Sequence, residues 1–210
     1  MKKILVLIAA VALSMPSFAQ FKSGGFSLSK DNLYYGVRIG FTSASFSGDS
    51  EVAKETGSKV GMTLGGVVGL RVSSSIPLFV ESGLYYSERG AKEGNLKVSH
   101  NNLEIPLLIK YGFKVHDDVA ILPFLGPVFA YGVSGKLKYE VGSEKVEVSA
   151  FDEDKWDALK RANMGFKLGC GVEYNNLYLE LGYQFGITDI SKIDAEVRSN
   201  AFFMNLGVNF

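Results

Sequence analysis

Residues 201–210 read AFFMNLGVNF, and their pattern decides how the whole sequence is interpreted. Apolar side chains occupy the even positions, and small or polar ones occupy most odd positions: Phe202, Met204, Leu206, Val208 and Phe210 against Phe203, Asn205, Gly207 and Asn209. Successive side chains of a β-strand point to opposite faces. The segment therefore predicts a strand with one apolar face and one mostly small or polar face.

The same period of two recurs in six other segments, at 35–42, 60–72, 78–86, 103–113, 164–174 and 177–187, and a seventh segment, 119–133, completes a set of eight strands. Most have about ten alternating residues, the length that a tilted strand needs to cross a membrane. The segment 119–133 differs, because it is apolar on both faces and contains Pro123 and Pro127. Its inner face stays unassigned, and we expect a β-bulge there because proline has no N–H to donate.

The distribution of charge over the two faces indicates what surrounds the sheet. The apolar faces carry no charged residue, and a Lys or Arg on a lipid-facing surface costs about 2–4 kcal/mol at the bilayer midplane. The opposite faces carry charges that we expect to pair inside a barrel: Arg38, Arg71, Lys110 and Lys167 with Glu81, Glu104, Glu173 and Glu180. An eight-stranded barrel is just wide enough to be filled by its own side chains, so this network is interpreted as structural packing.

The connections between the segments alternate in length. Short ones lie at 73–77, 114–118 and 175–176, and longer ones at 47–59, 90–95, 135–162 and 188–200. The sequence therefore predicts an all-β fold: an eight-stranded antiparallel up-and-down transmembrane β-barrel with short periplasmic turns and longer extracellular loops. Within the longest loop we expect a hairpin over 137–148 and a short helix over 152–161, capped by Asp152.

Aromatic residues gather near the strand ends, where barrels of this kind carry girdles at the membrane interfaces. We expect six aromatic residues in a girdle at the periplasmic side: Tyr34, Tyr35, Tyr111, Phe113, Tyr174 and Phe210. Tyr86 and Phe202 are expected towards the opposite side.

The N-terminus and the composition bound the domain organisation. Residues 1–19 combine a basic start, an apolar run and small residues before Gln20, which predicts a cleaved signal peptide. Residues 20–32 would form an N-terminal periplasmic segment and residues 33–210 the barrel domain. The 22 basic and 22 acidic residues balance, which gives no support for nucleic-acid binding, and the single cysteine, Cys170, excludes an internal disulfide.

With these features, the sequence resembles the PorT-type, or porin-family, small outer-membrane β-barrel proteins of Gram-negative bacteria. The matching stretches are LEIPLL at 103–108, PFLGP at 123–127 and the closing Asn209-Phe210. The resemblance implies an outer-membrane location, with Phe210 as the assembly signal read by the barrel-assembly machinery. It also implies contact with outer-membrane lipid and lipopolysaccharide. An extracellular or periplasmic protein partner is compatible with the resemblance, which assigns no biochemical activity.

Catalytic chemistry has one weak candidate, a Ser-His-Glu arrangement of Ser99, His100 and Glu104 at the rim, while His116 is expected in a solvated turn. We expect no catalytic residue, no cofactor and no metal site. The favoured function is a structural or interaction role with a side-chain-filled lumen. The alternatives are a narrow porin-like channel for small solutes or ions and a rim lipid-modifying enzyme. A soluble lipocalin-like barrel is disfavoured, because it would have an apolar lumen.

Overall fold

The computed structural model describes residues 33–47, 57–73, 75–93, 96–116, 118–141, 144–149, 151–152, 156–157, 160–191 and 197–210. The expected signal peptide and N-terminal segment, residues 1–32, lie outside the described residues. Regular structure in the described part is β-strand, with no helix. No helix of the length and apolar character needed to cross a membrane is found in that part of the chain.

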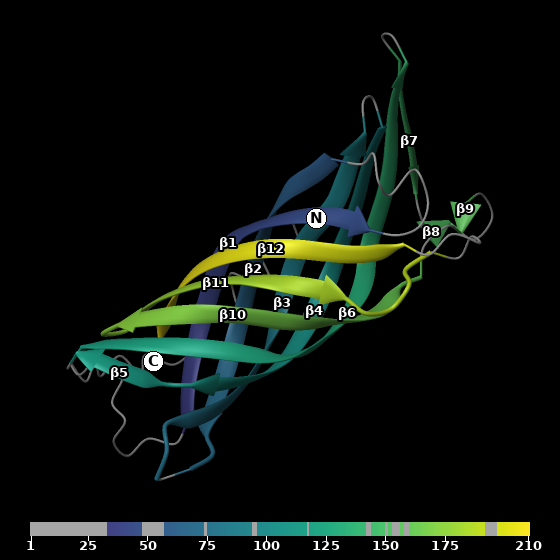
Figure 1. The fold of residues 1–210 in the computed structure, drawn as a ribbon. Helices are drawn as coiled ribbons and strands as arrows, with labels where there is room; N and C mark the ends of the chain where they lie inside the picture. Colours follow the sequence, from purple (N-terminus) through teal and green to yellow (C-terminus); the bar gives the residue numbers. More distant parts are fainter. Residues whose placement is uncertain are drawn as a thin grey trace, which may run out of the picture.

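Eight antiparallel strands close into a barrel (Figure 1). Each pairs with its neighbours along the chain, β6 pairs with both β4 and β10, and the pairing of β1 with β12 closes the ring. The predicted eight-stranded up-and-down barrel is therefore confirmed. The strands are β1 (Leu33–Ser47), β2 (Gly57–Arg71), β3 (Leu78–Glu93), β4 (Leu96–Tyr111), β6 (Val119–Val141), β10 (Ala162–Tyr174), β11 (Leu177–Gly186) and β12 (Arg198–Asn209).

The two ends of the barrel differ. At one end, here called the turn end, β1 begins beside the end of β12, and Tyr35 and Phe210 exchange two backbone hydrogen bonds of 3.1 and 2.7 Å. The tight turn between β10 and β11 lies there too, with Asn175 in the left-handed region at φ 53°. At the opposite, loop end, β6 runs on and pairs with β7 (Glu144–Ser149). Figure 1 shows this hairpin standing clear of the barrel, in agreement with the hairpin predicted there.

Two local predictions are wrong. The expected turn at 114–118 is shorter, because β5 (Phe113–His116) is a strand that pairs with the start of β6. In place of a helix over 152–161, β8 (Phe151–Asp152) and β9 (Trp156–Asp157) form a two-residue antiparallel pair. A capping residue and a run of acids are local helix signals, and strand pairing overrides them.

The two-sided apolar strand β6 now has assigned faces. Over residues 120–132 its even residues, including Leu122 and Phe124, are buried inside, and the odd residues between them, including Ile121 and Phe129, face outward and are exposed or half-buried. The predicted bulge at the prolines is wrong, because the pairing of β6 with β10 runs without a shift from Val119 to Tyr131. The register shift lies further along, where Asn101 and Asn102 of β4 oppose Ser134 and Gly132. Pro123 and Pro127 thus lack N–H donors, but the register of β6 against β10 continues unchanged through both of them.

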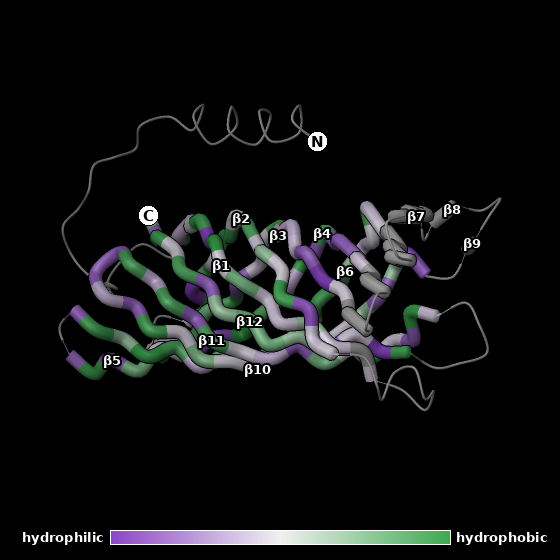
Figure 2. Tube along the Cα trace, turned by 90° about the horizontal axis from the view of Figure 1, so that it is seen from above, coloured by the Kyte–Doolittle hydropathy of each residue, from purple (hydrophilic) through white to green (hydrophobic). Residues whose placement is uncertain are grey.

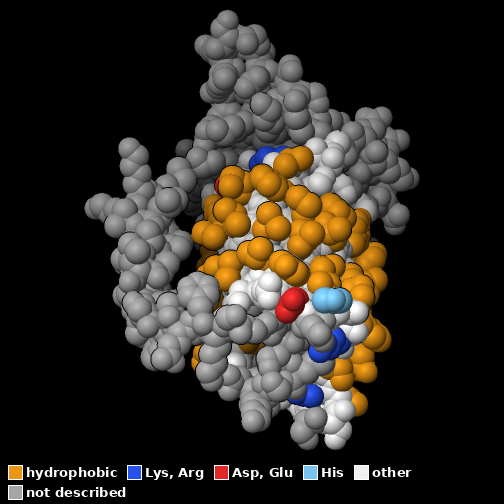
Figure 3. All heavy atoms as spheres, turned by 90° about the vertical axis from the view of Figure 1, so that its left-hand side faces the viewer, with side chains coloured by type: hydrophobic (Ala, Val, Ile, Leu, Met, Phe, Trp, Pro, Cys, Tyr) orange, Lys and Arg blue, Asp and Glu red, His pale blue; other side chains and the backbone are white. Residues whose placement is uncertain are grey.

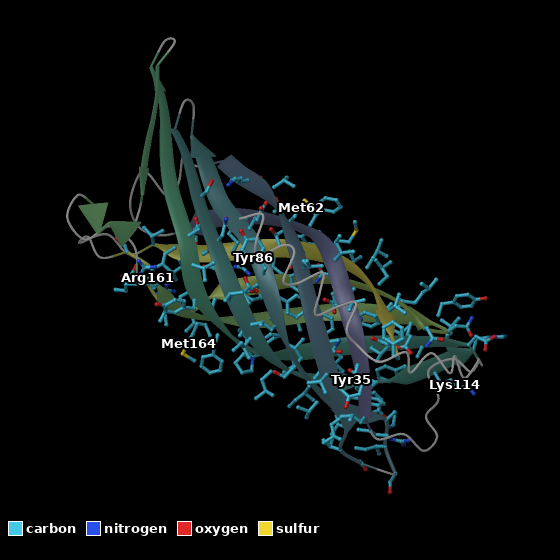
Figure 4. All side chains as sticks on the ribbon, turned by 180° about the vertical axis from the view of Figure 1, so that it is seen from behind. Tyr35, Met62, Tyr86, Lys114, Arg161 and Met164 are labelled. Atoms are coloured by element: carbon cyan, nitrogen blue, oxygen red, sulfur yellow. The ribbon has the colours of Figure 1, made fainter. Side chains whose placement is uncertain are left out.

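The outside of the barrel is apolar over most of its height. Ile39, Leu107 and Leu168 are 53%, 48% and 50% exposed, respectively. Figure 3 shows this surface as a broad apolar band, and Figure 4 shows Met62 and Met164 pointing away from the barrel on opposite walls. In Figure 2, short hydrophobic and hydrophilic stretches alternate along the strands. A contiguous apolar surface of this extent marks a membrane-facing wall.

Aromatic side chains border the apolar band at both ends. Tyr35, Phe113 and Tyr174 are exposed near the turn end, and the rings of Tyr111 and Phe113 contact each other with centroids 4.6 Å apart. Towards the loop end, Phe202 is exposed and the rings of Tyr183 and Phe185 lie 4.7 Å apart. These positions match the girdles expected of a membrane barrel.

Candidate functional site: the lumen

Charged side chains from several strands meet inside the barrel. The alternation of the strands turns them inward, where the surrounding wall excludes water. Most predicted members of the charge network are buried in the lumen: Arg38, Glu81, Glu104, Lys110, Lys167, Glu173 and Glu180. Arg71, the eighth, is half-buried opposite Phe79 near the turn end.

The first of two ion-paired groups, the turn-end charge group, is centred on Lys110 of β4. Its ammonium nitrogen lies 2.8 Å from Glu81 Oε1 and 3.7 Å from Glu180 Oε2. It donates a 2.8 Å hydrogen bond to the Tyr178 hydroxyl and lies 4.6 Å from the centre of that ring. Arg38 reaches Glu81 Oε2 at 3.7 Å. Removing such charges from water is costly, and this density of partners offsets the cost.

A second set of contacts ties the end of β12 to this group. Asn209 accepts a 2.6 Å hydrogen bond from Arg38 through Oδ1 and donates one of 2.7 Å from Nδ2 to Glu173. Nearby, Asn205 donates a 2.7 Å bond to Glu180. The polar positions of the last strand therefore join β1, β10 and β11 along the inner side of the wall.

The loop-end charge group is centred on Glu104 of β4. Its two carboxylate oxygens lie 2.6 Å from Arg89 Nη2 and 3.2 Å from Lys167 Nζ. Arg89 also donates a 2.6 Å hydrogen bond to the side-chain oxygen of Gln184. With Arg89 included, the buried charges of the described lumen residues cancel, four cations against four carboxylates: Arg38, Arg89, Lys110 and Lys167 against Glu81, Glu104, Glu173 and Glu180.

Between the two groups lies a layer of apolar side chains that we call the septum, formed by Leu108, Phe124 and Phe203. The two rings are stacked, with centroids 6.3 Å apart and planes at 30°. Phe124 lies over Gly169 and Phe203 lies over Gly182, where a Cβ atom would collide with each ring. The glycines of β10 and β11 thus make room for the rings of their direct partners on the neighbouring strands β6 and β12.

Two residues were misjudged at the level of sequence. Arg89 was missed because Glu88, on the outward face, ends the apolar pattern of β3 at Tyr86. Continuing the inward series from Glu81 and Tyr85 by two steps would have found it. Tyr34 was expected in the periplasmic girdle, but its hydroxyl points inward and donates a 2.7 Å hydrogen bond to Glu81.

The rim enzyme arrangement does not assemble. His100 is fully buried on the lumen side of β4, and Glu104 is engaged by Arg89 and Lys167. Ser99 is adjacent to His100 in the strand and therefore points to the other side, where its hydroxyl accepts a 2.6 Å hydrogen bond from Lys59. The three side chains cannot act together on a lipid. His116 is exposed in β5.

Other candidate chemistry is limited. No group of three or more His, Cys, Asp or Glu side chains within the described ranges could hold a metal ion. Cys170 is exposed on the outer face. Phe210 is also exposed at the turn end, where its backbone pairs with Tyr35.

Comparisons with known proteins identify the fold. A family model described as "Outer membrane protein beta-barrel domain" matches residues 18–192. No curated protein matches the sequence.

Among solved structures, the chain is similar to Neisserial surface protein A at 17% identity and a TM-score of 0.48, covering 86% of this chain and 98% of that one. It is similar to a major outer membrane protein from Thermus thermophilus at 12% identity and a TM-score of 0.48, covering 86% of this chain and 100% of that one. It is also similar to Ail of Yersinia pestis at 15% identity and a TM-score of 0.41, covering 86% of this chain and 100% of that one. Because the family model matches most of the chain, the protein belongs to the outer membrane protein beta-barrel domain family and is a protein of the outer membrane.

Proposed function

We propose that this protein is a closed, non-conducting and non-enzymatic barrel that serves as a scaffold in the outer membrane. The observation that carries the proposal is the lumen, in which Lys110 and Glu104 each join partners from opposite walls. In an eight-stranded barrel the lumen is about as wide as the side chains that fill it. An ion that entered the lumen would meet these side chains across its width.

In this proposal the barrel holds the β6–β7 hairpin and the neighbouring loops outside the cell for contact with lipopolysaccharide or a protein partner. The turn end faces the periplasm, and Phe210 provides the signal read by the barrel-assembly machinery. The PorT-type resemblance of the segments at 103–108 and 123–127 is consistent with a role of this kind.

Planar-bilayer recording of the purified barrel tests the closed lumen. We expect no steady unitary current from the wild-type protein. Steady unitary currents that disappear when Arg38 or Glu180 is replaced would contradict the proposal and favour a narrow channel. Orientation is tested separately: an epitope inserted between Val141 and Glu144, at the tip of the β6–β7 hairpin, should be accessible to antibody on intact cells.

A further inference from the structure

The two charge groups of the lumen are separate from one another. The ion pairs of the described lumen residues lie within the turn-end group around Lys110 or within the loop-end group around Glu104, and none of them joins the two. Instead, each group has an ammonium beside the septum. Lys110 Nζ lies 5.1 Å from the centre of the Phe124 ring, and Lys167 Nζ lies 5.1 Å from the centre of the Phe203 ring. The stacked rings therefore stand between the two cations.

The septum reaches across the lumen from several walls. Leu108 comes from β4, Phe124 from β6 and Phe203 from β12. Each ring lies over a glycine that is its direct partner on the neighbouring strand, Gly169 of β10 for Phe124 and Gly182 of β11 for Phe203, so no side chain of these partners holds the rings away from one another. On a fourth side, Tyr85 of β3 is buried over Gly65 of β2, and Lys167 lies 5.1 Å from the Tyr85 ring.

Physical chemistry assigns different roles to the charged and the apolar layers. Charged and amide side chains can exchange their partners for water or a passing ion. An apolar constriction has no such partners, and hydrophobic constrictions are known to close pores by dewetting. We propose that the septum of Leu108, Phe124 and Phe203 is the ion barrier of this barrel, and that the ion-paired groups on either side set the stability of the lumen without sealing it. This inference rests on the proposed closed-lumen function and names the site of closure.

The test compares two double variants that alter the same strands on opposite faces. Phe124→Ala with Phe203→Ala removes the septum rings. Phe129→Ala with Phe202→Ala removes rings of β6 and β12 that are 49% and 48% exposed on the outer wall. After correct folding has been checked by circular dichroism in detergent, both are recorded in planar bilayers. We expect a gain of steady unitary current in the septum variant and silence in the outer-wall variant.

A third variant separates the septum from the ion pairs. Glu104→Gln with Arg89→Gln abolishes the shortest ion pair of the loop-end group and keeps the septum intact. We expect this variant to stay silent. The inference is overturned if the folded septum variant is silent, or if the ion-pair variant conducts as strongly as the septum variant.

Two further outcomes also have a definite meaning. If the septum double variant does not fold, the single variants Phe124→Ala and Phe203→Ala replace it, and silence of both overturns the inference. A wild-type protein that already conducts would instead contradict the proposed function itself, so the two failures are distinguishable.

Discussion

At the scale of single residues, the stability of the lumen depends most on Lys110. It is the one described side chain whose ammonium contacts two carboxylates, Glu81 and Glu180, and two aromatic rings, Phe124 and Tyr178. Removing one partner of a buried ion pair is more damaging than replacing the whole pair, because the remaining charges stay buried without compensation.

The first prediction concerns this lysine. Lys110→Met keeps the apolar stem and leaves Glu81 and Glu180 without the ammonium, so we expect a loss of about 3–5 kcal/mol in the free energy of unfolding. The matched control is Lys114→Met on the exposed strand β5, which should change stability by less than about 0.5 kcal/mol. Urea unfolding in lipid vesicles measures both, and equal small effects would refute a central role for Lys110.

A second prediction at this scale concerns two glycines on opposite faces of the wall. A Cβ at Gly182 would collide with the Phe203 ring and lie 2.8 Å from the Leu168 carbonyl oxygen. Gly182→Ala should therefore cost about 1–3 kcal/mol through overpacking. At Gly66, which faces outward, the nearest atom would be 3.9 Å away, so Gly66→Ala should be neutral or stabilising. The same unfolding assay compares them, and a reversed order would be incompatible with rings packed on glycine.

How much of the site was predictable depended on how far the alternation could be followed. Glu104, Lys110 and Glu180 lie within cleanly alternating segments, and the sequence assigned them to the lumen. Arg89 lies where β3 has passed the apolar band, so its outward neighbour Glu88 no longer signals a membrane face. The separation into two groups by a septum depends on which side chains meet across the barrel, and no single strand carries that information.

At the scale of elements, the period of two predicted the barrel strands but not their full lengths. β3, β4 and β6 extend well past the segments chosen from the sequence. The extensions of β3 and β4 start where polar residues, Glu88 and Asn101, occupy the outward positions, so the contrast between the two faces ends there. β6 was difficult for another reason. Its inward face is apolar at the septum, so both of its faces are apolar and the sequence shows no alternation of apolar and polar residues there.

An element-scale prediction uses the depth of β11 in the membrane. Leu181 lies near the middle of this strand, and Leu177 is its first residue at the turn end. Arg at a lipid-facing position costs about 2–4 kcal/mol at the midplane and about 0–1 kcal/mol near an interface. We therefore expect Leu181→Arg to be clearly more destabilising than Leu177→Arg when the protein unfolds from vesicles. Equal costs would argue against a membrane spanned in this direction.

The connection between β11 and β12 gives a prediction for pH. Backbone hydrogen bonds from Val197 and Ser191 lower the pKa of Asp189 to about 2, and Lys160, 3.0 Å away, adds to the effect. A depressed carboxyl pKa stabilises the loop above the ordinary value of 3.8, and this contribution is lost as the pH falls through about 2.

The expected observation is that the amide protons of Val197 and Ser191 lose protection from hydrogen exchange between pH 4 and pH 2, as followed by NMR. In the control Asp189→Asn, the exchange of these amides should not change with Asp titration. An unchanged pH response in that variant would mean that another group holds the loop.

At the scale of the whole molecule, the barrel and the β6–β7 hairpin are separable. Among the described strands, β7 pairs with β6 alone. Residues 136–139 of β6 also pair with β4, but residues 140 and 141 pair with β7 alone. Replacing residues 140–149 with a short Gly-Ser linker should therefore leave a folded barrel with the same resistance to detergent unfolding. A deletion of similar length over β10 should abolish folding, because β10 pairs with β6 on one side and β11 on the other. Gel mobility without heating distinguishes these outcomes.

The pairing of β1 with β12 joins the barrel strand that is synthesised first to the one that is synthesised last. Without β12 the cylinder cannot close, and a sheet of the other strands would have two unpaired edges, one at β1 and one at β11. Unpaired strand edges favour aggregation, so this connectivity makes protection of the chain against aggregation a requirement until its last strand is in place.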